Sequence, residues 1–309
     1  MIRLLSSEAL RFRSRRIVKV LMILAIIGSV VGAALAAAAS TKPSADELAH
    51  AETQRQATIE RCVRKDGFQD SFGPRPSDQS VQDYCAANIG ASEFISGDPV
   101  TLGEVGEYIK AAGFIVIVIG LVIGASMVGA SWQTGTITTI LTWEPRRIRW
   151  LLARLVVTAV GVFIVTMVLL GVLAAALALA AVLRGSTATE PGWLGDLLAT
   201  MARISVVASA IALIGAAVAT IGRNTAAALG AVFVYLALLE SLIRGLRPML
   251  SRFMLGDSAV VLISGNELEV SDGSTVMVLT QGHAYVVLAT WVALVVAVGL
   301  VMLRARDVN

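Results

Sequence analysis

Six apolar stretches, each close to the length needed to cross a bilayer, constrain this 309-residue chain more than any other feature. A hydrocarbon core about 30 Å thick takes roughly 20 consecutive apolar residues of helix. The stretches are residues 20–39, 111–130, 155–183, 204–222, 225–242 and 284–303. Because 56% of the residues are hydrophobic and only 15% are charged, the sequence predicts an all-α integral membrane protein with six transmembrane helices. The stretch 225–242 is the shortest, so five spans with a re-entrant segment are the alternative.

The placement of lysine and arginine predicts the orientation, because basic residues beside membrane spans stay in the cytoplasm. With a cytoplasmic N-terminus, the inner segments hold 13 basic and 3 acidic residues, a net charge of +10. The outer segments then hold 12 basic and 19 acidic residues, a net charge of −7. We therefore expect a multi-pass protein with both termini in the cytoplasm. The formal net charge of +3 reflects this topology and gives no reason to expect a nucleic-acid partner.

Residues 1–19 are predicted to form an amphipathic helix that lies in the membrane interface, with arginines around its polar sides. The apolar face of this helix consists of Ile2, Leu5, Ala9 and Phe12. The alternative is a basic tail that only fixes the topology. The apolar run that follows ends in ALAAAAS at 34–40, which resembles a signal-peptide cleavage site. Since the run is about 20 residues long, and signal cores are usually 7 to 15, we expect a retained span.

Residues 40–110 form the largest segment outside the predicted spans. Ser44 and Glu47 have the spacing of a capping box, which predicts a helix from there to about residue 63. Cys62 and Cys85 are the only cysteines, and the topology places both in an oxidising compartment. We therefore predict a disulfide that ties this external loop. A zinc site is not expected, because no histidines lie beside the two cysteines.

Three shorter features lie outside the spans. Residues 80–89 are compatible with a second short helix. The segment 243–283 is predicted to be external or re-entrant, and its apolar fragment 260–264 is too short to span. Within it, LEVSDGSTVMV at 268–278 alternates about an Asp-Gly pair, which predicts a β-hairpin.

The sequence contains no recognisable catalytic or ion-conducting site. None of the four lysines follows a glycine, so the GxxxxGK[ST] phosphate loop is absent. Glu240 is the one carboxylate in the six stretches; it lies near an outer end and is expected to pair with Arg244 at i+4. His50 and His283 belong to no metal pair or triad. We therefore expect neither enzyme activity, nor a metal, nor a cofactor bound by this chain.

The connection between the second and third spans is unusual. Residues 111–143 carry no charge and as one helix would measure about 50 Å, which exceeds the membrane. Trp132 and the hydroxyl residues after it mark the exit from the bilayer, and Pro145 forces a break. Residues 131–150 are thus predicted to contain a short helix on the cytoplasmic face. The alternative is an ordinary cytoplasmic hairpin whose arginines only follow the positive-inside rule.

This connection carries a family resemblance. The run GASWQTGTITTILTWEPRRIRWLLAR at 129–154, the six spans, the external loop after the first span and the closing LRARDV resemble permease subunits of type 2 ATP-binding-cassette (ABC) exporters, especially the actinobacterial drug-export branch. The resemblance implies a coupling helix that docks on a separate ATPase. The implied contact residues are Gly135, Thr136, Ile137, Ile140, Leu141, Trp143, Glu144, Pro145, Arg146 and Arg147. Relatives often carry an acidic residue before the tryptophan, where this chain has Ser131, so Glu144 is the better candidate to bind an ATPase arginine.

The resemblance implies a permease in a bacterial plasma membrane, assembled with two copies of a separate ABC ATPase that bind ATP and Mg, a second identical or related permease, and membrane lipid. The resemblance also implies ATP-driven export. Because the sequence predicts no ion path and no charged residue within the cores of the spans, we expect the exported compound to be amphipathic or hydrophobic, such as a drug, an antibiotic or a lipid-like molecule. The family arrangement implies a pathway between the second and fifth spans, lined by Phe114, Met127, Phe233 and Tyr235. Each of these residues is as readily explained by packing or lipid contact.

Two other functions and one packing prediction complete the sequence-based expectations. A non-transporting membrane scaffold or sensor, with the disulfide-tied loop as receptor, is the main alternative function. A stand-alone secondary carrier is weaker, because ionisable residues are missing from the spans. Gly120 and Gly124 form a GxxxG face that predicts close packing of the second span on another helix.

Overall fold

The structure is a computed structural model that describes residues 2–40, 44–64, 80–90, 94, 100–137, 139, 146–185, 187, 189, 192–271 and 276–305. The chain divides into two compact units. Unit 1 consists of residues 1–30, 105–175 and 190–309, and unit 2 of residues 31–104 and 176–189. Each unit is described by itself.

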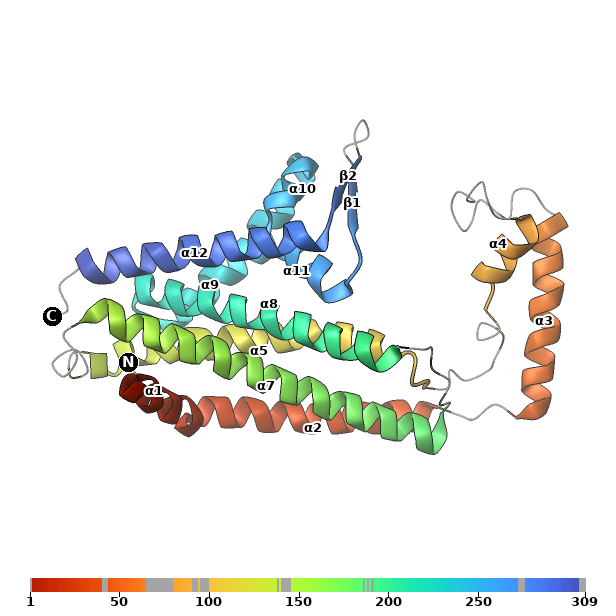
Figure 1. Ribbon diagram of the computed structural model, residues 1–309, viewed down its shortest axis with the longest axis horizontal. Helices are drawn as coiled ribbons and strands as arrows, with labels where there is room; N and C mark the ends of the chain where they lie inside the picture. The colour runs from red at the N-terminus through yellow and green to blue at the C-terminus, as the bar shows by residue number, and fades with distance from the viewer. Residues whose placement is uncertain are drawn as a thin grey trace. The chain divides into compact units, whose positions relative to one another are not determined.

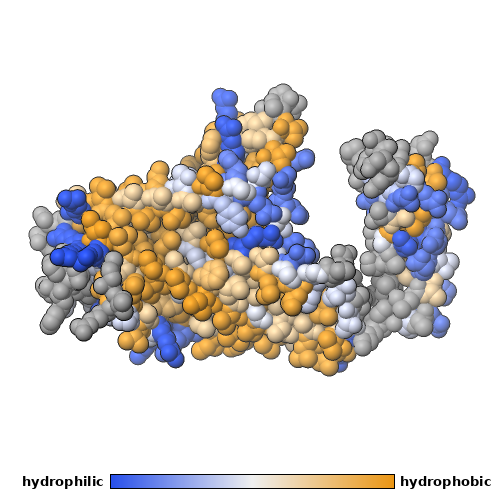
Figure 2. All heavy atoms as spheres, in the orientation of Figure 1, coloured by the Kyte–Doolittle hydropathy of each residue, from blue (hydrophilic) through white to orange (hydrophobic). Residues whose placement is uncertain are grey.

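The described residues contain six helices that are long and apolar enough to cross a membrane. They are α2 (Arg16–Ala39), α5 (Val105–Gln133), α7 (Arg147–Arg184), α8 (Trp193–Gly222), the continuous helix Thr225–Leu246 and α12 (Gln281–Ala305). Figure 2 shows apolar residues covering most of the visible surface of unit 1. The six predicted helices are confirmed, and they indicate a multi-pass membrane protein.

The helix Thr225–Leu246 is continuous although its hydrogen bonding changes twice. It comprises α9 (Thr225–Val234), the π-helical turn η3 (Tyr235–Leu239) and α10 (Glu240–Leu246). Its 22 residues suffice for a full crossing, which favours six spans over the re-entrant alternative. The other helices also extend beyond the predicted apolar stretches. The largest extension is in α8, which begins at Trp193, whereas the predicted stretch begins at residue 204.

The core of unit 1 is built on α8, the most buried of the six long helices. α5 lies against it in the same direction. A Cβ atom on Gly124 would lie 2.0 Å from the Ala212 carbonyl oxygen, and one on Gly120 would lie 2.9 Å from that of Ala208. These distances confirm the predicted GxxxG packing, because only glycine lets the two backbones approach so closely.

One end of unit 1 carries a small subdomain of short helices and two strands, which we call the hairpin end (Figure 1). After α10 come the 3₁₀-helix η4 (Pro248–Phe253), α11 (Leu255–Ser264), β1 (Leu268–Ser271) and β2 (Val276–Leu279). The strands pair antiparallel, with Leu268 opposite Leu279 and Ser271 opposite Val276. The predicted hairpin is therefore confirmed, while its turn lies outside the described residues. The apolar fragment 260–264 forms the second half of α11.

The predicted pairing of Glu240 with Arg244 is wrong. The Glu240 side chain is buried, and each of its carboxylate oxygens lies 3.0 Å from the backbone nitrogen of Gly256, which donates to them at the start of α11. Arg244 instead forms an ion pair with Asp257. A carboxylate is favoured at a helix N-terminus because the free backbone N–H groups and the helix dipole attract it. Glu240 therefore binds the distant start of α11 rather than the neighbouring Arg244.

Unit 2 contains two helices joined by the predicted disulfide. α3 (Ala45–Arg64) starts at the capping box: the Glu47 backbone N–H donates to Ser44 Oγ at 3.2 Å, and the Ser44 N–H to the Glu47 carboxylate at 2.8 Å. Ser80 caps α4 (Val81–Asn88). Cys62 and Cys85 are bonded to each other and fully buried. Both helix predictions and the disulfide prediction are confirmed.

We expect the disulfide to supply much of the stability of unit 2. Replacing both cysteines by serine should destabilise the α3–α4 pair by about 3 kcal/mol, because the unfolded loop is no longer closed. Hydrogen exchange of the α3 and α4 amides should accelerate in the double variant and leave the amides of α8 unaffected. Unchanged α3–α4 exchange would contradict the prediction.

Candidate functional site

At the other end of unit 1, which we call the basic end, several helices begin or end (Figure 1). α5 and α8 end there, α7 and α9 begin there, and α12 ends there. The arginines of this end are Arg15, Arg146, Arg147, Arg149, Arg154, Arg223 and Arg304. It also holds the start of the segment predicted to be a coupling helix.

The N-terminal helix α1 (Ile2–Ser14) packs against this end of unit 1. Phe12 is buried on α7, where a Cβ atom on Gly161 would lie 2.6 Å from its ring. The buried face of α1 also contains Glu8, whereas Ala9 is exposed. The helix prediction is confirmed, but the face that is buried is rotated from the one the apolar residues suggested.

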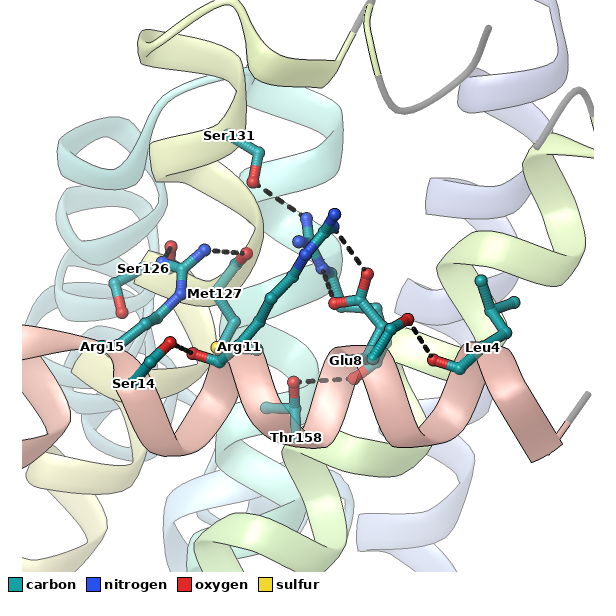
Figure 3. Close-up of polar contacts among 11 residues, drawn as sticks. Leu4, Glu8, Arg11, Ser14, Arg15, Ser126, Met127, Ser131 and Thr158 are labelled. Carbon is teal, nitrogen blue, oxygen red and sulfur yellow. Dashed lines mark hydrogen bonds and ion pairs between the residues drawn. The ribbon is translucent and has the colours of Figure 1, made fainter. Parts of the chain in front are cut away.

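Glu8 forms a buried ion pair with Arg154 of α7 (Figure 3). The Arg154 Nε lies 3.0 Å from Glu8 Oε2, and both side chains are 1% exposed. Arg154 also donates from Nη1 to Ser131 Oγ of α5 at 2.9 Å. One guanidinium thus connects three helices, α1, α5 and α7. Its other contact is the Trp150 ring, whose centroid lies 4.7 Å from the guanidinium carbon.

Arg15, at the bend between α1 and α2, attaches this bend to α5. Its guanidinium donates to the carbonyl oxygens of Ser126 at 2.6 Å and Met127 at 3.1 Å (Figure 3). Burial, helped by the positive charge of Arg154, lowers the pKa of Arg15 to about 10. That value is still well above neutral pH, so Arg15 stays charged and α1 is held to α5 by charge-assisted hydrogen bonds.

The residues just before the predicted coupling helix join α5 to the start of α9. Gly129 permits this contact, because a Cβ atom there would lie 2.7 Å from the Thr225 backbone nitrogen. Gln133 donates to the Asn224 side chain at 3.0 Å, and Asn224 caps α9 by accepting from the Ala226 N–H. A further contact is the Arg223 guanidinium over the Trp132 ring at 4.7 Å.

The predicted coupling segment begins with a turn. Gly135 has φ +67°, a left-handed conformation that favours glycine. Ile137 is 2% exposed and packs in one cluster with Trp150 and Leu151. Thr136 is exposed, Arg146 is exposed, and Arg147 is half-buried. Ile140, Leu141, Trp143, Glu144 and Pro145 lie outside the described residues.

The four predicted pathway residues lie in different environments. Phe114 and Phe233 are exposed, at 52% and 67%. Met127 is fully buried in the cluster beneath α1, and Tyr235 packs against the Trp291 ring at a centroid distance of 5.1 Å. The described part of unit 1 does not bring the four together, and their role in a pathway stays a prediction.

The chain matches no protein-family model and no curated protein. Its function must therefore be argued from the residues themselves. Among the described residues, no group of three or more histidine, cysteine or acidic side chains is placed to hold a metal ion. His283 contacts the Arg252 carbonyl oxygen at 2.8 Å, and His50 is exposed on α3.

Sequence reasoning missed the role of Glu8, which it treated only as one acidic residue in a basic segment. One signal was available: Glu8 lies one helical turn before Phe12, on the side of α1 that faces the protein. A carboxylate on a buried face requires a partner, since an isolated buried charge is very costly. The partner itself was not predictable, because Arg154 is 146 residues away.

Proposed function

We propose that this chain is the pathway-forming permease subunit of an ABC exporter that moves an amphipathic or hydrophobic compound. The observation that carries the proposal is that the described residues on both sides of the 138–145 segment are anchored at the basic end. Ile137 packs in the core on one side of the segment, and Arg154 ties the helix on its other side to α1 and α5. In the proposal, a displacement of this segment therefore moves α1, α5 and α7 together.

In the proposal, the basic end faces the cytoplasm and the segment from Gly135 to Arg147 contacts a separate ATPase. Ile137 holds the segment in place, since its side chain is buried, while Trp143 and Glu144 provide the contact. ATP and Mg are bound by the ATPase, because this sequence has no phosphate loop. Two permease copies, or this chain and a related one, assemble with two ATPases.

Coupling then works as a shift between conformations. The ATPase pair contacts the two segments differently with and without ATP, and this difference in binding energy shifts the permease between its states. α5 carries the motion into the membrane, because Gly120 and Gly124 bind it closely to α8. The exposed Phe114 and Phe233 are the predicted pathway residues best placed to meet a substrate from outside this chain.

The proposal is tested by purifying the tagged full-length chain from its native host and identifying the proteins that accompany it. We expect an ABC ATPase in about equal amount. In vesicles containing the pair, Trp143→Ala and Glu144→Ala should lower export of a lipophilic dye by roughly 5- to 150-fold, the range of typical coupling energies, while ATP hydrolysis continues. Glu269→Ala, an exposed acidic residue of β1, is the matched control and should export normally.

Two results would contradict the proposal. One is the absence of any copurifying ATPase under conditions that keep the chain folded. The other is full dye export by both variants in the vesicle assay. In the first case the scaffold or sensor function becomes the better explanation, and ligands of the α3–α4 unit become the next subject of study.

A further inference from the structure

A long apolar groove runs along unit 1 between α7 and α12, with α8 as its floor; α8 lies between these two helices in Figure 1. Its volume is about 810 Å³. The groove is open because several of its lining residues are small: Ala159, Ser209, Ala210, Ala289 and Ala293. Phe163 and Tyr285 lie at the end of the groove farther from the basic end. The same face is apolar in Figure 2.

A second hollow of about 410 Å³ lies at the basic end and is formed by arginines of the same two helices. It is lined by Arg146, Arg147, Ile148, Arg149 and Arg304. Among the described residues, no carboxylate lies within ion-pair distance of Arg149 or Arg304. Within the described part of the chain, the hollow therefore concentrates positive charge.

Helical periodicity places the apolar groove and the arginine-lined hollow one after the other along α7 and α12. On α7 the groove is lined by Leu152, Leu155, Val156, Ala159, Val160 and Phe163. Arg149 precedes Leu152 by three residues, so it continues this stripe by one turn. On α12 the stripe runs from Tyr285 to Val296, and Arg304 follows Val296 by eight residues, which places it about two turns farther along, at the edge of the same face. The arginines thus stand at the mouth of the apolar groove.

The length of the groove matches one leaflet of a bilayer. Its α7 wall, from Leu152 to Phe163, covers eleven steps of helix and measures about 17 Å. Half of a hydrocarbon core is about 15 Å. An acyl chain whose headgroup lies at the arginines would therefore fill the groove over one leaflet.

We propose that this groove and its arginines bind an anionic phospholipid. The acyl chain lies between α7 and α12 over the small residues of α8 and α12, and the phosphate is held by Arg149 and Arg304. Guanidinium groups bind phosphate with paired, charge-assisted hydrogen bonds. Basic pockets between membrane helices are a typical site for anionic headgroups. A zwitterionic headgroup carries its own cation into the hollow and is bound less well.

The other occupant of such a groove would be a helix of a second copy. Two copies in one membrane have the same orientation, and a twofold axis pairs each patch with itself. Their arginine hollows would then lie at the same depth and close together, which is unfavourable without counter-ions. Charge complementarity therefore favours lipid. The inference does not depend on the proposed transport function, because Arg149 and Arg304 are not among the proposed ATPase contacts.

Delipidated full-length protein, titrated with phosphatidylglycerol or phosphatidylcholine and observed by native mass spectrometry, tests the proposal. We expect tighter binding of phosphatidylglycerol. The Arg149→Gln, Arg304→Gln double variant should weaken phosphatidylglycerol binding by about 30-fold, since each arginine near a membrane surface contributes about a factor of five. Its phosphatidylcholine binding should fall much less, because the choline cation already offsets the charge of that phosphate.

Two further variants separate the headgroup from the acyl chain. Arg13→Gln, Arg16→Gln removes the same charge from exposed positions of α1 and α2 and should keep the lipid selectivity. Ala293→Trp should fill the groove and weaken both lipids. Undiminished phosphatidylglycerol binding by the Arg149→Gln, Arg304→Gln variant or by Ala293→Trp would overturn the proposal. Disulfide formation between copies through Ala293→Cys would also overturn it, by showing that a second copy covers the groove; the native cysteines are already bonded to each other.

Discussion

Glu8→Ala is expected to lower the free energy of unfolding by about 3–5 kcal/mol, the typical cost of removing one partner from a buried ion pair. Arg154 would keep its charge at a site where it is 1% exposed and close to the positive charges of Arg11 and Arg15. Its remaining contacts would be the Ser131 hydroxyl and the Trp150 ring. Unfolding of the purified protein in detergent, followed by tryptophan fluorescence, measures the loss. Trp150 reports directly on the site because it lies against the Arg154 guanidinium.

The matched control is Glu107→Ala, which removes the acidic partner of Lys110 near the start of α5. That pair is as short, at 2.7 Å, but the Glu107 side chain is 72% exposed. Exposed ion pairs contribute about 0–1 kcal/mol, so this variant should differ little from the native protein. Equal effects of the two variants would show that Glu8 and Arg154 are solvated rather than buried.

Moving the carboxylate from α1 to α5 distinguishes two roles of Glu8: neutralising the buried charge of Arg154, and holding α1 against the other helices. In the Glu8→Ser, Ser131→Glu variant the carboxylate moves from α1 to α5, where it can still reach Arg154. We expect most of the lost stability to return, while α1 keeps only Phe12 and Arg15 as anchors. Limited trypsin digestion at Arg13 should then be faster than in the native protein. Slow digestion would mean that Glu8 is not needed to hold α1.

The serine at position 131 belongs to the same network around Arg154. The resemblance to ABC permeases implies an acidic residue before the tryptophan, and this chain lacks one there. In the structure Ser131 of α5 and Glu8 of α1 both bind Arg154. The position is therefore still part of a salt-bridge network, with the negative charge on a different helix.

Features that depend on local sequence were predictable here. The six membrane helices follow from the length of their apolar runs, and the hairpin at 268–279 from its alternation. The capping box at Ser44 and the disulfide follow from spacing and from the predicted compartment. In each case the residues that form the structure are neighbours in the chain or have no alternative partner.

Features that depend on how helices meet were not predictable. Glu240 binds the start of α11 rather than Arg244, and Glu8 binds a helix 146 residues away. The groove between α7 and α12 was also missed, since each of its walls looks like an ordinary apolar stripe. The groove exists because small residues of α7, α8 and α12 meet there, a property of the assembled helices rather than of one segment.

Gly124→Ala is the second change with a large expected effect. A methyl group at this position would lie 2.0 Å from the Ala212 carbonyl oxygen, so α5 and α8 must separate. We expect the free energy of unfolding to fall by about 3 kcal/mol, at the upper end of the usual cost of overpacking, because the obstacle is backbone that cannot rotate away.

Gly28→Ala in α2 is the matched control, since a Cβ atom there meets nothing within 4 Å. It should be neutral or stabilising by up to about 1 kcal/mol, the helix preference of alanine over glycine. Gly124→Ala should thus lower the unfolding temperature, while Gly28→Ala should leave it unchanged or raise it. Equal shifts would contradict the close contact of α5 with α8 on which the core of unit 1 depends.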